Sequence, residues 1–419
     1  MNRKYSILVG IVLSATLLTA CSSNSTASNS EDKELTKEEK LVTDQTNREV
    51  KVKKDPDSIV VGGILPYFSA WFVGTNSTKE IKGLHPNAYN AAENSMLAKI
   101  SPDVKKASTE FVKNGDINIE ELSKINPDVY FELASEEKTL DKVAESGIPT
   151  IGLETVNDED DDPLTTFNSW LEVTSDIKGG KTSERTDKFM QEGEKSQKMI
   201  DESLKDTKKS EKPKVLFLHQ HTDNSIVVAG SNFHSEKWIK ATGGVDVVGE
   251  DGVEGQKEVN MEQIYKWNPD KIYITNFTET QPEDLIENKT DGQDWSQVKA
   301  VKDKEVYKVP LGIYRWFPPN GDAPLMLKWM AQHNHPDKFK YNMEDEIKTY
   351  YQKFYDYELS DKDVKSILHP SSDARKILIF DNSKCNIRWQ KQNYKNRLCV
   401  STKSLTLLAL FCAHVPLLF

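Results

Sequence analysis

The sequence carries one motif twice, as EELSKINPDVYF at residues 120–131 and as EQIYKWNPDKIY at residues 262–273. Each copy reads as a short helix that breaks at Asn-Pro-Asp before a β-favouring run. The proline disfavours the α conformation in the asparagine before it, so we expect the helix to end there and a strand to follow. Such a unit can recur by chance in an α/β protein, but acidic and apolar positions also match between the two helices. The repeat therefore predicts two similar α/β lobes.

Other apolar runs fit the same plan. SIVVGG at residues 58–63 and KVLFLH at residues 214–219 are expected to open the two lobes. Continuous apolar runs of this kind are typical of strands that are covered on both faces. The predicted fold class is α/β, with two Rossmann-like lobes at residues 43–180 and 212–375.

A long charged segment at residues 181–211 separates the two lobes, and its apolar residues come only at intervals. This pattern predicts one helix with a largely solvated surface. A helix of about thirty residues would be about 45 Å long. We expect a single long backbone helix that joins the lobes and limits hinge motion between them; an ordinary surface helix is the alternative.

The N-terminus has the pattern of an export signal. Two basic residues precede an apolar run at residues 7–20, which ends on Cys21. The run is shorter than the roughly twenty residues that span a membrane, so residues 1–20 are predicted to be a signal peptide. The Leu-Thr-Ala-Cys ending resembles the lipobox of bacterial lipoproteins, which implies that Cys21 is diacylated and anchors the protein outside the cell membrane. A secretory signal with a chance cysteine is the alternative. Residues 21–42 are polar and are expected to form a disordered tether.

Composition and cysteine content narrow the function. The formal net charge is −11 and the pI is near 5.4, which argues against nucleic acid as a partner because phosphate binding needs a basic surface. The only cysteine before Cys385 is Cys21, so we expect a body without disulfides or thiolate metal ligands. The sequence shows no nucleophile elbow, zinc-protease motif, phosphate-binding loop or dinucleotide fingerprint. We therefore expect no enzyme.

Residues 376–419 differ in character from the rest of the chain. They are basic, contain three of the four cysteines, and end in an apolar stretch that is too short to span a membrane comfortably. We interpret this tail as a read-through or frame-altered extension outside the fold. A second membrane contact is the alternative.

Several segments together carry a family resemblance. They are the two Pro-Asp units, the long segment between the lobes, Gly230-Ser231, WIKATGGV at residues 238–245 and VKAVKDKEVY at residues 298–307. In combination and order, residues 43–368 resemble the helical-backbone (class III) substrate-binding proteins of ABC importers. The resemblance implies two lobes on one long helix, a ligand cleft between the lobes and little closure on binding.

The resemblance also implies the function and the partners. Proteins of this class capture ferric siderophores, haem, cobalamin and related metal chelates. We expect a monomer that takes an iron–siderophore or related metal chelate, with no cofactor besides that ligand, and delivers it to an ABC permease dimer with its ATPase. The alternatives are a lipid-anchored haem, cobalamin or nickel-chelate receptor and a surface hydrolase.

Two glutamates match the place where this class docks on its permease. Glu120 and Glu262 each lie seven residues before the proline of their repeat, so a pseudo-twofold body would present both carboxylates to a twofold partner. Pairing with arginines of the permease would give these contacts orientation and energy. The alternative is that both residues only stabilise a helix N-terminus.

Two segments rich in aromatic residues are expected to form cleft loops beyond the strand ends, where open α/β sheets bind ligands. They are PYFSAWF at residues 66–72 and YRWFPP at residues 314–319. Aromatic rings can stack on flat chelates, and an arginine can pair with an anionic group. The residues predicted to bind ligand are Tyr67, Trp71, Tyr314, Arg315 and Trp316; packing in the lobe cores is the alternative for each aromatic residue.

His219 and His221 lie two residues apart at the end of a predicted strand, so both imidazoles are expected on one face. They are weak candidates for metal contact, because two ligands alone do not make a site. Glu132, at the end of the strand in the first repeat, is a further candidate for the ligand site.

Overall fold

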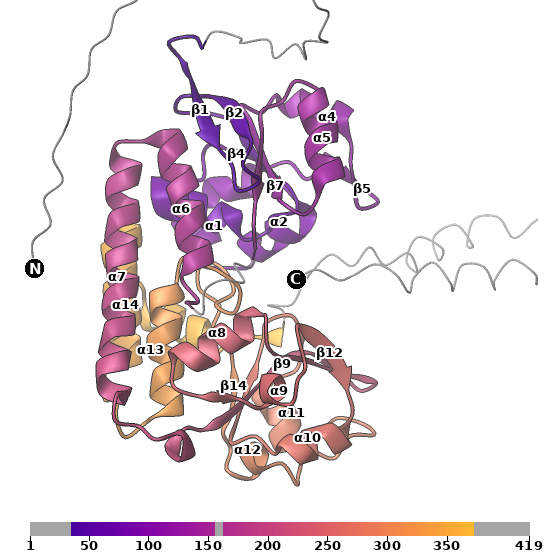
Figure 1. Cartoon of the computed structure of the whole chain (residues 1–419), viewed down its shortest axis with the longest axis vertical. Helices are drawn as coiled ribbons and strands as arrows, with labels where there is room; N and C mark the ends of the chain where they lie inside the picture. The colour runs from indigo at the N-terminus through magenta and orange to yellow at the C-terminus, as the bar shows by residue number, and fades with distance from the viewer. Residues whose placement is uncertain (1–34, 156–161, 373–419) are drawn as a thin grey trace, which may run out of the picture.

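The structure, a computed structural model, describes residues 35–155 and 162–372. The expected signal peptide at residues 1–20, the expected lipidation site Cys21 and the tail at residues 376–419 lie outside these ranges. The described chain forms two α/β lobes joined along helix α7 (Lys181–Leu204), as Figure 1 shows. No helix in the described ranges is long and apolar enough to cross a membrane.

The N-terminal lobe is built on a parallel sheet with the strand order β4-β3-β7-β8. Its strands are β3 (Ile59–Val61), β4 (Ile81–Leu84), β7 (Val129–Leu133) and β8 (Thr150–Leu153). Its helices are α1 (Tyr67–Thr75), α2 (Pro86–Glu93), α3 (Leu97–Ile100), α4 (Ile119–Ile125), α5 (Glu137–Glu145) and α6 (Thr165–Lys178). A small hairpin, β5 (Val112–Lys113) and β6 (Asp116–Ile117), precedes α4. Both faces of the sheet are buried, as the apolar runs predicted.

A second hairpin precedes this sheet and corrects the expected limit of the tether. Strand β1 (Glu39–Thr43) pairs with β2 (Glu49–Lys53), so ordered structure starts inside the segment at residues 21–42. The buried Asp44 carboxylate accepts hydrogen bonds from Gly152 N of β8 at 2.9 Å and from the Arg48 guanidinium. The hairpin was not recognised in the sequence because most of its residues are charged or polar and few are apolar.

The C-terminal lobe has a mixed sheet with the strand order β12-β10-β9-β13-β14, in which β11 also pairs with β9. The strands β9 (Lys214–Thr222), β13 (Lys271–Ile274) and β14 (Val306–Lys308) are parallel, as is the short β11 (Val245–Asp246). β10 (Ser225–Ala229) and β12 (Gln256–Val259) are antiparallel additions. The helices are α8 (His234–Ala241), α9 (Val247–Glu250), α10 (Met261–Trp267), α11 (Pro282–Ile286), α12 (Lys299–Lys302), α13 (Ala323–Asn334), α14 (Met343–Tyr355) and α15 (Asp361–Leu368).

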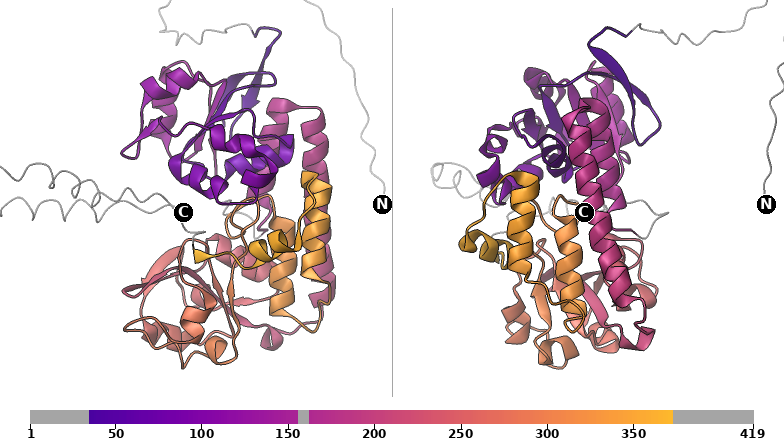
Figure 2. Two further views of the ribbon diagram at one scale, coloured as in Figure 1. Left: turned by 180° about the vertical axis from the view of Figure 1, so that it is seen from behind. Right: turned by 90° about the vertical axis from the view of Figure 1, so that its left-hand side faces the viewer.

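The long helix is confirmed, but it is shorter and more buried than expected. It has 24 residues, about 36 Å, and ends at Leu204 because the next residues are polar and offer nothing to pack. A short 3-10 turn, η2 (Lys209–Glu211), follows. One face of α7 is buried at Thr182, Thr186, Phe189, Gly193, Ser196 and Ile200, which is helical spacing. Figure 2 shows α7 running along both lobes, and it packs on α1 and α6 of the first and on α8 and α13 of the second.

The repeated motif has the same structure in both lobes. Helices α4 and α10 each have seven residues, and the side chain of an asparagine, Asn118 or Asn260, caps the N-terminus of each. Each helix ends on the asparagine before the proline, with φ of 51° at Asn126 and 42° at Asn268. The expected helix break is confirmed, although the asparagine is left-handed rather than extended. Asparagine tolerates this conformation because its short polar side chain bonds locally.

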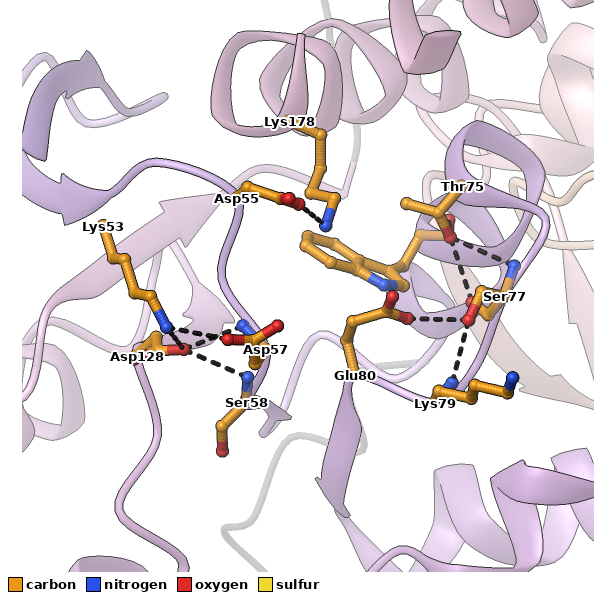
Figure 3. A network of polar contacts seen from close by, with 11 residues as sticks. Lys53, Asp55, Asp57, Ser58, Thr75, Ser77, Lys79, Glu80, Asp128 and Lys178 are labelled. Carbon is orange, nitrogen blue, oxygen red and sulfur yellow. Dashed lines mark hydrogen bonds and ion pairs between the residues drawn. The ribbon is translucent and has the colours of Figure 1, made fainter. Parts of the chain in front are cut away.

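The aspartate of each repeat clamps the start of the neighbouring strand. Asp128 Oδ2 accepts hydrogen bonds from Asp57 N at 2.8 Å and Ser58 N at 3.1 Å, just before β3, and also contacts Lys53 (Figure 3). In the second lobe Asp270 Oδ2 accepts from Lys214 N, the first residue of β9, at 2.8 Å. The repeated Pro-Asp therefore joins two parallel strands at their amino ends.

We expect Asp128→Ala and Asp270→Ala each to lower the free energy of unfolding by about 1–3 kcal/mol, since each leaves strand N–H groups without their charged acceptor. The two losses should add, because the sites lie in different lobes and share no partner. Urea unfolding measures both. Asp303→Ala, which removes an exposed pair with Lys299, is the control and should change stability by less than about 0.5 kcal/mol. Full stability in either clamp variant would contradict the assignment.

Candidate functional site

The N-terminal lobe has a cavity at the carboxyl ends of its strands, where open α/β sheets bind ligands. Its volume is about 360 Å³. The loop after β3, the residue after β4, the end of β7, the β5–β6 hairpin and α5 form its walls. The lining residues are Gly63, His85, Gly115, Asp116, Ile117, Glu132, Leu133, Glu136, Lys138, Thr139 and Lys142.

Glu132, one of the predicted ligand-binding residues, lines this cavity. Its carboxylate accepts hydrogen bonds from Tyr130 Oη at 2.5 Å and from Leu133 N at 2.9 Å. Burial raises the pKa of Glu132 above its usual value, although these hydrogen bonds act in the opposite direction. Gly62 and Gly63 make room for the pair, since a Cβ atom at either position would lie 2.1 Å from Tyr130 Oη or Glu132 Oε1.

His85 contributes a second polar group to the same cavity. Its Nδ1 accepts a hydrogen bond from Asn87 N at 3.2 Å and so caps α2. Burial lowers the pKa of His85 to about 4, so the ring is neutral near pH 7. A neutral imidazole that accepts at Nδ1 carries its hydrogen on Nε2, and His85 therefore supplies a hydrogen-bond donor.

The C-terminal lobe presents a group of rings at the corresponding edge of its sheet, which we call the aromatic cluster: His219, Phe233, His234, Phe277 and Phe317. His219 is its centre, with ring centroids 5.0 Å from Phe277, 5.6 Å from Phe317 and 5.8 Å from Phe233. Burial, Lys237 and His219 lower the pKa of His234 to about 3, so this ring is also neutral.

Arg315 lies against the aromatic cluster. Its guanidinium carbon is 4.9 Å from the ring centroid of Phe277 and 5.7 Å from that of Tyr314, distances at which a cation is attracted by an aromatic face. Tyr314 in turn packs edge-on against Phe68 of the N-terminal lobe, with centroids 5.4 Å apart. Arg315 therefore belongs to a loop that contacts both lobes, and a planar cation beside neutral rings favours an anionic, flat partner.

The structure brings together some of the predicted residues and separates others. Glu132 lines the N-lobe cavity, and His219 and Arg315 lie at the edge of the C-lobe sheet, where both side chains are buried, with 0% and 3% of their surfaces exposed. Tyr67 and Trp71 were expected in a loop, but residues 67–75 form helix α1 and both rings are fully buried in the N-lobe core. The Tyr67 hydroxyl bonds to Thr174 at 2.9 Å. These two predictions are corrected, because α1 is almost entirely apolar and residues 67–74 are all buried.

Three further predicted residues have structural partners. Trp316 is fully buried, and its indole N–H donates to Asp322 at 2.9 Å. Tyr314 packs on Phe68, as described above. His221 uses Nδ1 with Thr280 at 2.9 Å and Nε2 with Gln293 at 2.7 Å, so neither nitrogen is left for a metal. Within the ranges 35–155 and 162–372, no group of three or more metal-ligating side chains was found.

Phe277, Phe233 and His234 were not expected at the site from the sequence. Phe277 follows the strand of the second repeat by three residues, so its position at a strand end was a usable signal. His85 was visible as the residue between β4 and a Pro-started helix. Phe233 and His234 come from the start of α8, and no local pattern points to them.

Comparisons with known proteins agree with this architecture. Residues 79–311 match the family model described as periplasmic binding protein. A solved periplasmic solute-binding protein from Veillonella parvula is 33% identical, with a TM-score of 0.71, over 79% of this chain and 97% of that one.

Two more distant proteins share the fold. The molybdate-binding protein MolA of Haemophilus influenzae is 21% identical over 335 residues, 76% of this chain and 91% of MolA, and its molybdate-bound structure gives a TM-score of 0.65. Helicobacter pylori CeuE with bound Ni(II) is 21% identical over 78% of this chain and 99% of CeuE, with a TM-score of 0.59.

Proposed function

The chain belongs to the periplasmic binding protein family, and we propose that it captures an iron–siderophore or related metal chelate and passes it to an ABC permease dimer with its ATPase. Proteins of this family are extracytoplasmic and bind small molecules for ABC importers. The chain is a binding protein and not an enzyme, so the surface hydrolase considered from the sequence is set aside. The ligand class, the lipid anchor and the docking residues below are part of the proposal.

The placement of Arg315 carries the proposal for the ligand. Its guanidinium lies over the ring of Phe277, and the Phe277 centroid is 5.0 Å from that of His219. A fixed positive charge on an aromatic floor suits a flat anionic ligand, such as a catecholate complex or a porphyrin with its propionates. A free metal ion would need several converging ligands, and the described residues offer no such group.

The N-lobe cavity supports the second half of the site. Glu132 and His85 place polar hydrogen-bonding groups at strand ends of the first lobe, as Arg315 does for the second. A ligand held between these edges would touch both lobes.

A metal oxyanion is the second candidate. The likeness to MolA favours it, since MolA binds molybdate. Arg315 and the His85 N–H could serve such an anion, but a tetrahedral oxyanion has no flat face and would leave the aromatic cluster without a role. We therefore place the chelate first and keep haem, cobalamin and nickel chelates within that class.

The docking proposal rests on the matched helices. Glu120 and Glu262 are each the second residue of α4 and α10, and both are exposed. The Glu120 side chain is 83% exposed, and its Oε1 atom forms a long ion pair with Lys124 Nζ at 3.9 Å. Two exposed carboxylates in equivalent places suit two arginine pockets of a twofold permease.

The proposed lipid anchor at Cys21 would hold the protein near its permease. Strand β1 begins at Glu39, so the polar residues between Cys21 and this strand remain as the tether. Tethering raises the effective concentration of one partner beside the other.

We expect Arg315→Leu to weaken chelate binding by about 10- to 100-fold, the loss of one or two charge-assisted contacts. Arg315→Lys keeps the charge but loses the planar guanidinium, so its affinity for the chelate should lie between those of wild type and Arg315→Leu. Tryptophan fluorescence titration with ferric tris-catecholate, haemin, Ni(II)–histidine and molybdate measures this. The control is Lys302→Leu, which removes an exposed charge of the same lobe and should leave binding unchanged. Equal affinity of wild type and Arg315→Leu for every ligand that binds would reject the site.

The double variant Glu120→Arg/Glu262→Arg should reduce uptake by whole cells to background while the affinity for ligand stays within about twofold, because charge reversal would repel the permease arginines. Glu184→Arg/Asp337→Arg reverses two other exposed acids and should transport normally. Normal uptake by the first pair would remove the docking assignment without touching the ligand site.

A further inference from the structure

A buried carboxylate lies under the loop that carries Arg315, between β14 and α13. We propose that Asp322 is a positioning residue for Arg315: it fixes the residues on both sides of the guanidinium and thereby sets the affinity of the ligand site. The inference rests on the proposed role of Arg315 in ligand binding. It adds a residue that does not touch the ligand.

Asp322 binds this loop at two points that flank Tyr314 and Arg315. Its Oδ2 accepts hydrogen bonds from Ile313 N and from Trp316 Nε1, both at 2.9 Å. One oxygen therefore holds the residue before the Tyr314-Arg315 pair and the residue after it. Arg315 has little freedom to move along the loop while both bonds are present.

The same carboxylate ties the loop to helix α14. Tyr351 Oη donates to Oδ2 at 3.1 Å and Tyr355 Oη donates to Oδ1 at 3.0 Å. Tyr355 also contacts Phe72 of the N-terminal lobe, with centroids 5.4 Å apart. Through Asp322 the loop is fixed to the junction of the two lobes, and not only to its own sheet.

The packing around Asp322 leaves no room for a different arrangement. A Cβ atom at Gly312 would lie 1.8 Å from Asp322 Oδ2 and 2.4 Å from Tyr351 Oη, so glycine is required there. Asn320 bonds to Trp316 O at 2.8 Å and accepts from Asp322 N at 2.7 Å. Close contact on every side means that removal of the carboxylate would leave buried donors without partners.

All the groups that donate hydrogen bonds to the Asp322 carboxylate in these contacts are uncharged. Complete burial raises the pKa of Asp322 to about 6 although its hydrogen bonds lower it. The titratable groups that face it are Tyr350, Tyr351 and Tyr355 of α14, and Arg185 of α7 lies beyond them. Because the folded pKa is above the ordinary value of 3.8, the carboxylate destabilises the fold as pH rises from about 4 to about 6, and the effect is constant above that range.

Asparagine can replace this aspartate with little disturbance. The amide oxygen can keep the bonds from Ile313 and Trp316, and the amide NH₂ can donate to Tyr355 Oη, whose own hydrogen can then be donated to Gly321 O, 2.7 Å away. Alanine removes every one of these bonds. Asp322→Asn and Asp322→Ala therefore separate the geometry of the group from its charge.

Asp246→Ala is the matched control. Asp246 is also a buried acid of the C-terminal lobe with its pKa raised to about 6 by burial, and it accepts hydrogen bonds from Val248 N and Gly249 N. It caps α9 and is not part of the Arg315 loop. Any loss of affinity that merely follows a less stable lobe should appear in this variant as well.

The experiment uses the full chain, and both measurements are made at a temperature at which every variant is folded. Ferric tris-catecholate binding is followed by tryptophan fluorescence, and the Arg315 Nε–H and Trp316 indole N–H signals are followed by ¹H–¹⁵N NMR. We expect Asp322→Ala to weaken binding at least tenfold and to shift the Arg315 signal, with Asp322→Asn within about threefold of wild type and Asp246→Ala unchanged. The Trp316 signal should titrate with a midpoint near pH 6 in wild type and stay flat in Asp322→Asn.

Normal affinity and an unmoved Arg315 signal in Asp322→Ala would overturn the inference, and so would equal losses in Asp322→Ala and Asp246→Ala. Failure of the proposed function looks different. If wild type does not bind the tris-catecholate, or if Arg315→Leu binds it normally, the ligand assignment is wrong. The Arg315 signal then still decides whether Asp322 positions the side chain.

Discussion

One hydrophobic cluster runs through both lobes, and the rest of the structure depends on that continuity. A single cluster of buried side chains runs from Val61 and Phe131 of the first sheet, through Phe189 of α7, to Phe217 of the second. Arg185 of α7 adds a polar tie, donating to Val73 O of α1 at 2.9 Å and to Phe354 O of α14 at 2.5 Å. Separating the lobes would therefore expose apolar surface and leave a charged group without its acceptors.

This shared core holds the Arg315 loop in fixed relation to both lobes. Gly312 O accepts a hydrogen bond from Met96 N of the first lobe at 2.9 Å, and Lys99 of α3 pairs with Asp363 of α15 at 2.6 Å. Together with the packing of Tyr314 on Phe68, these contacts join the Arg315 loop to both lobes. Such an arrangement suits a receptor whose site is formed before the ligand arrives, which reduces the entropic cost of binding.

The sequence predicted the fold better than the site, for physical reasons. The Pro-Asp repeat acts through a local constraint, the proline that ends each helix, so its helix–strand structure could be inferred without tertiary contacts. The clamp at Asp128 joins distant parts of the chain and could not be inferred in this way. The burial of Tyr67 and Trp71 could not, because it depends on α6 and α7, which pack around α1. The hairpin at Glu39 was missed since its burial comes from a few residues and from the distant Gly152. Arg315 was found as a charge in an aromatic segment, whereas Asp322 below it is visible only in three dimensions.

The ligand that the native protein retains tests the central claim most directly. The protein purified from its own host without added metal, then examined for metal content and visible absorbance, should carry a metal chelate in stoichiometric amount. Molybdenum without a chromophore would favour the oxyanion instead. Protein that retains neither metal nor chelate, and that binds none of the chelates offered to it, would contradict the account.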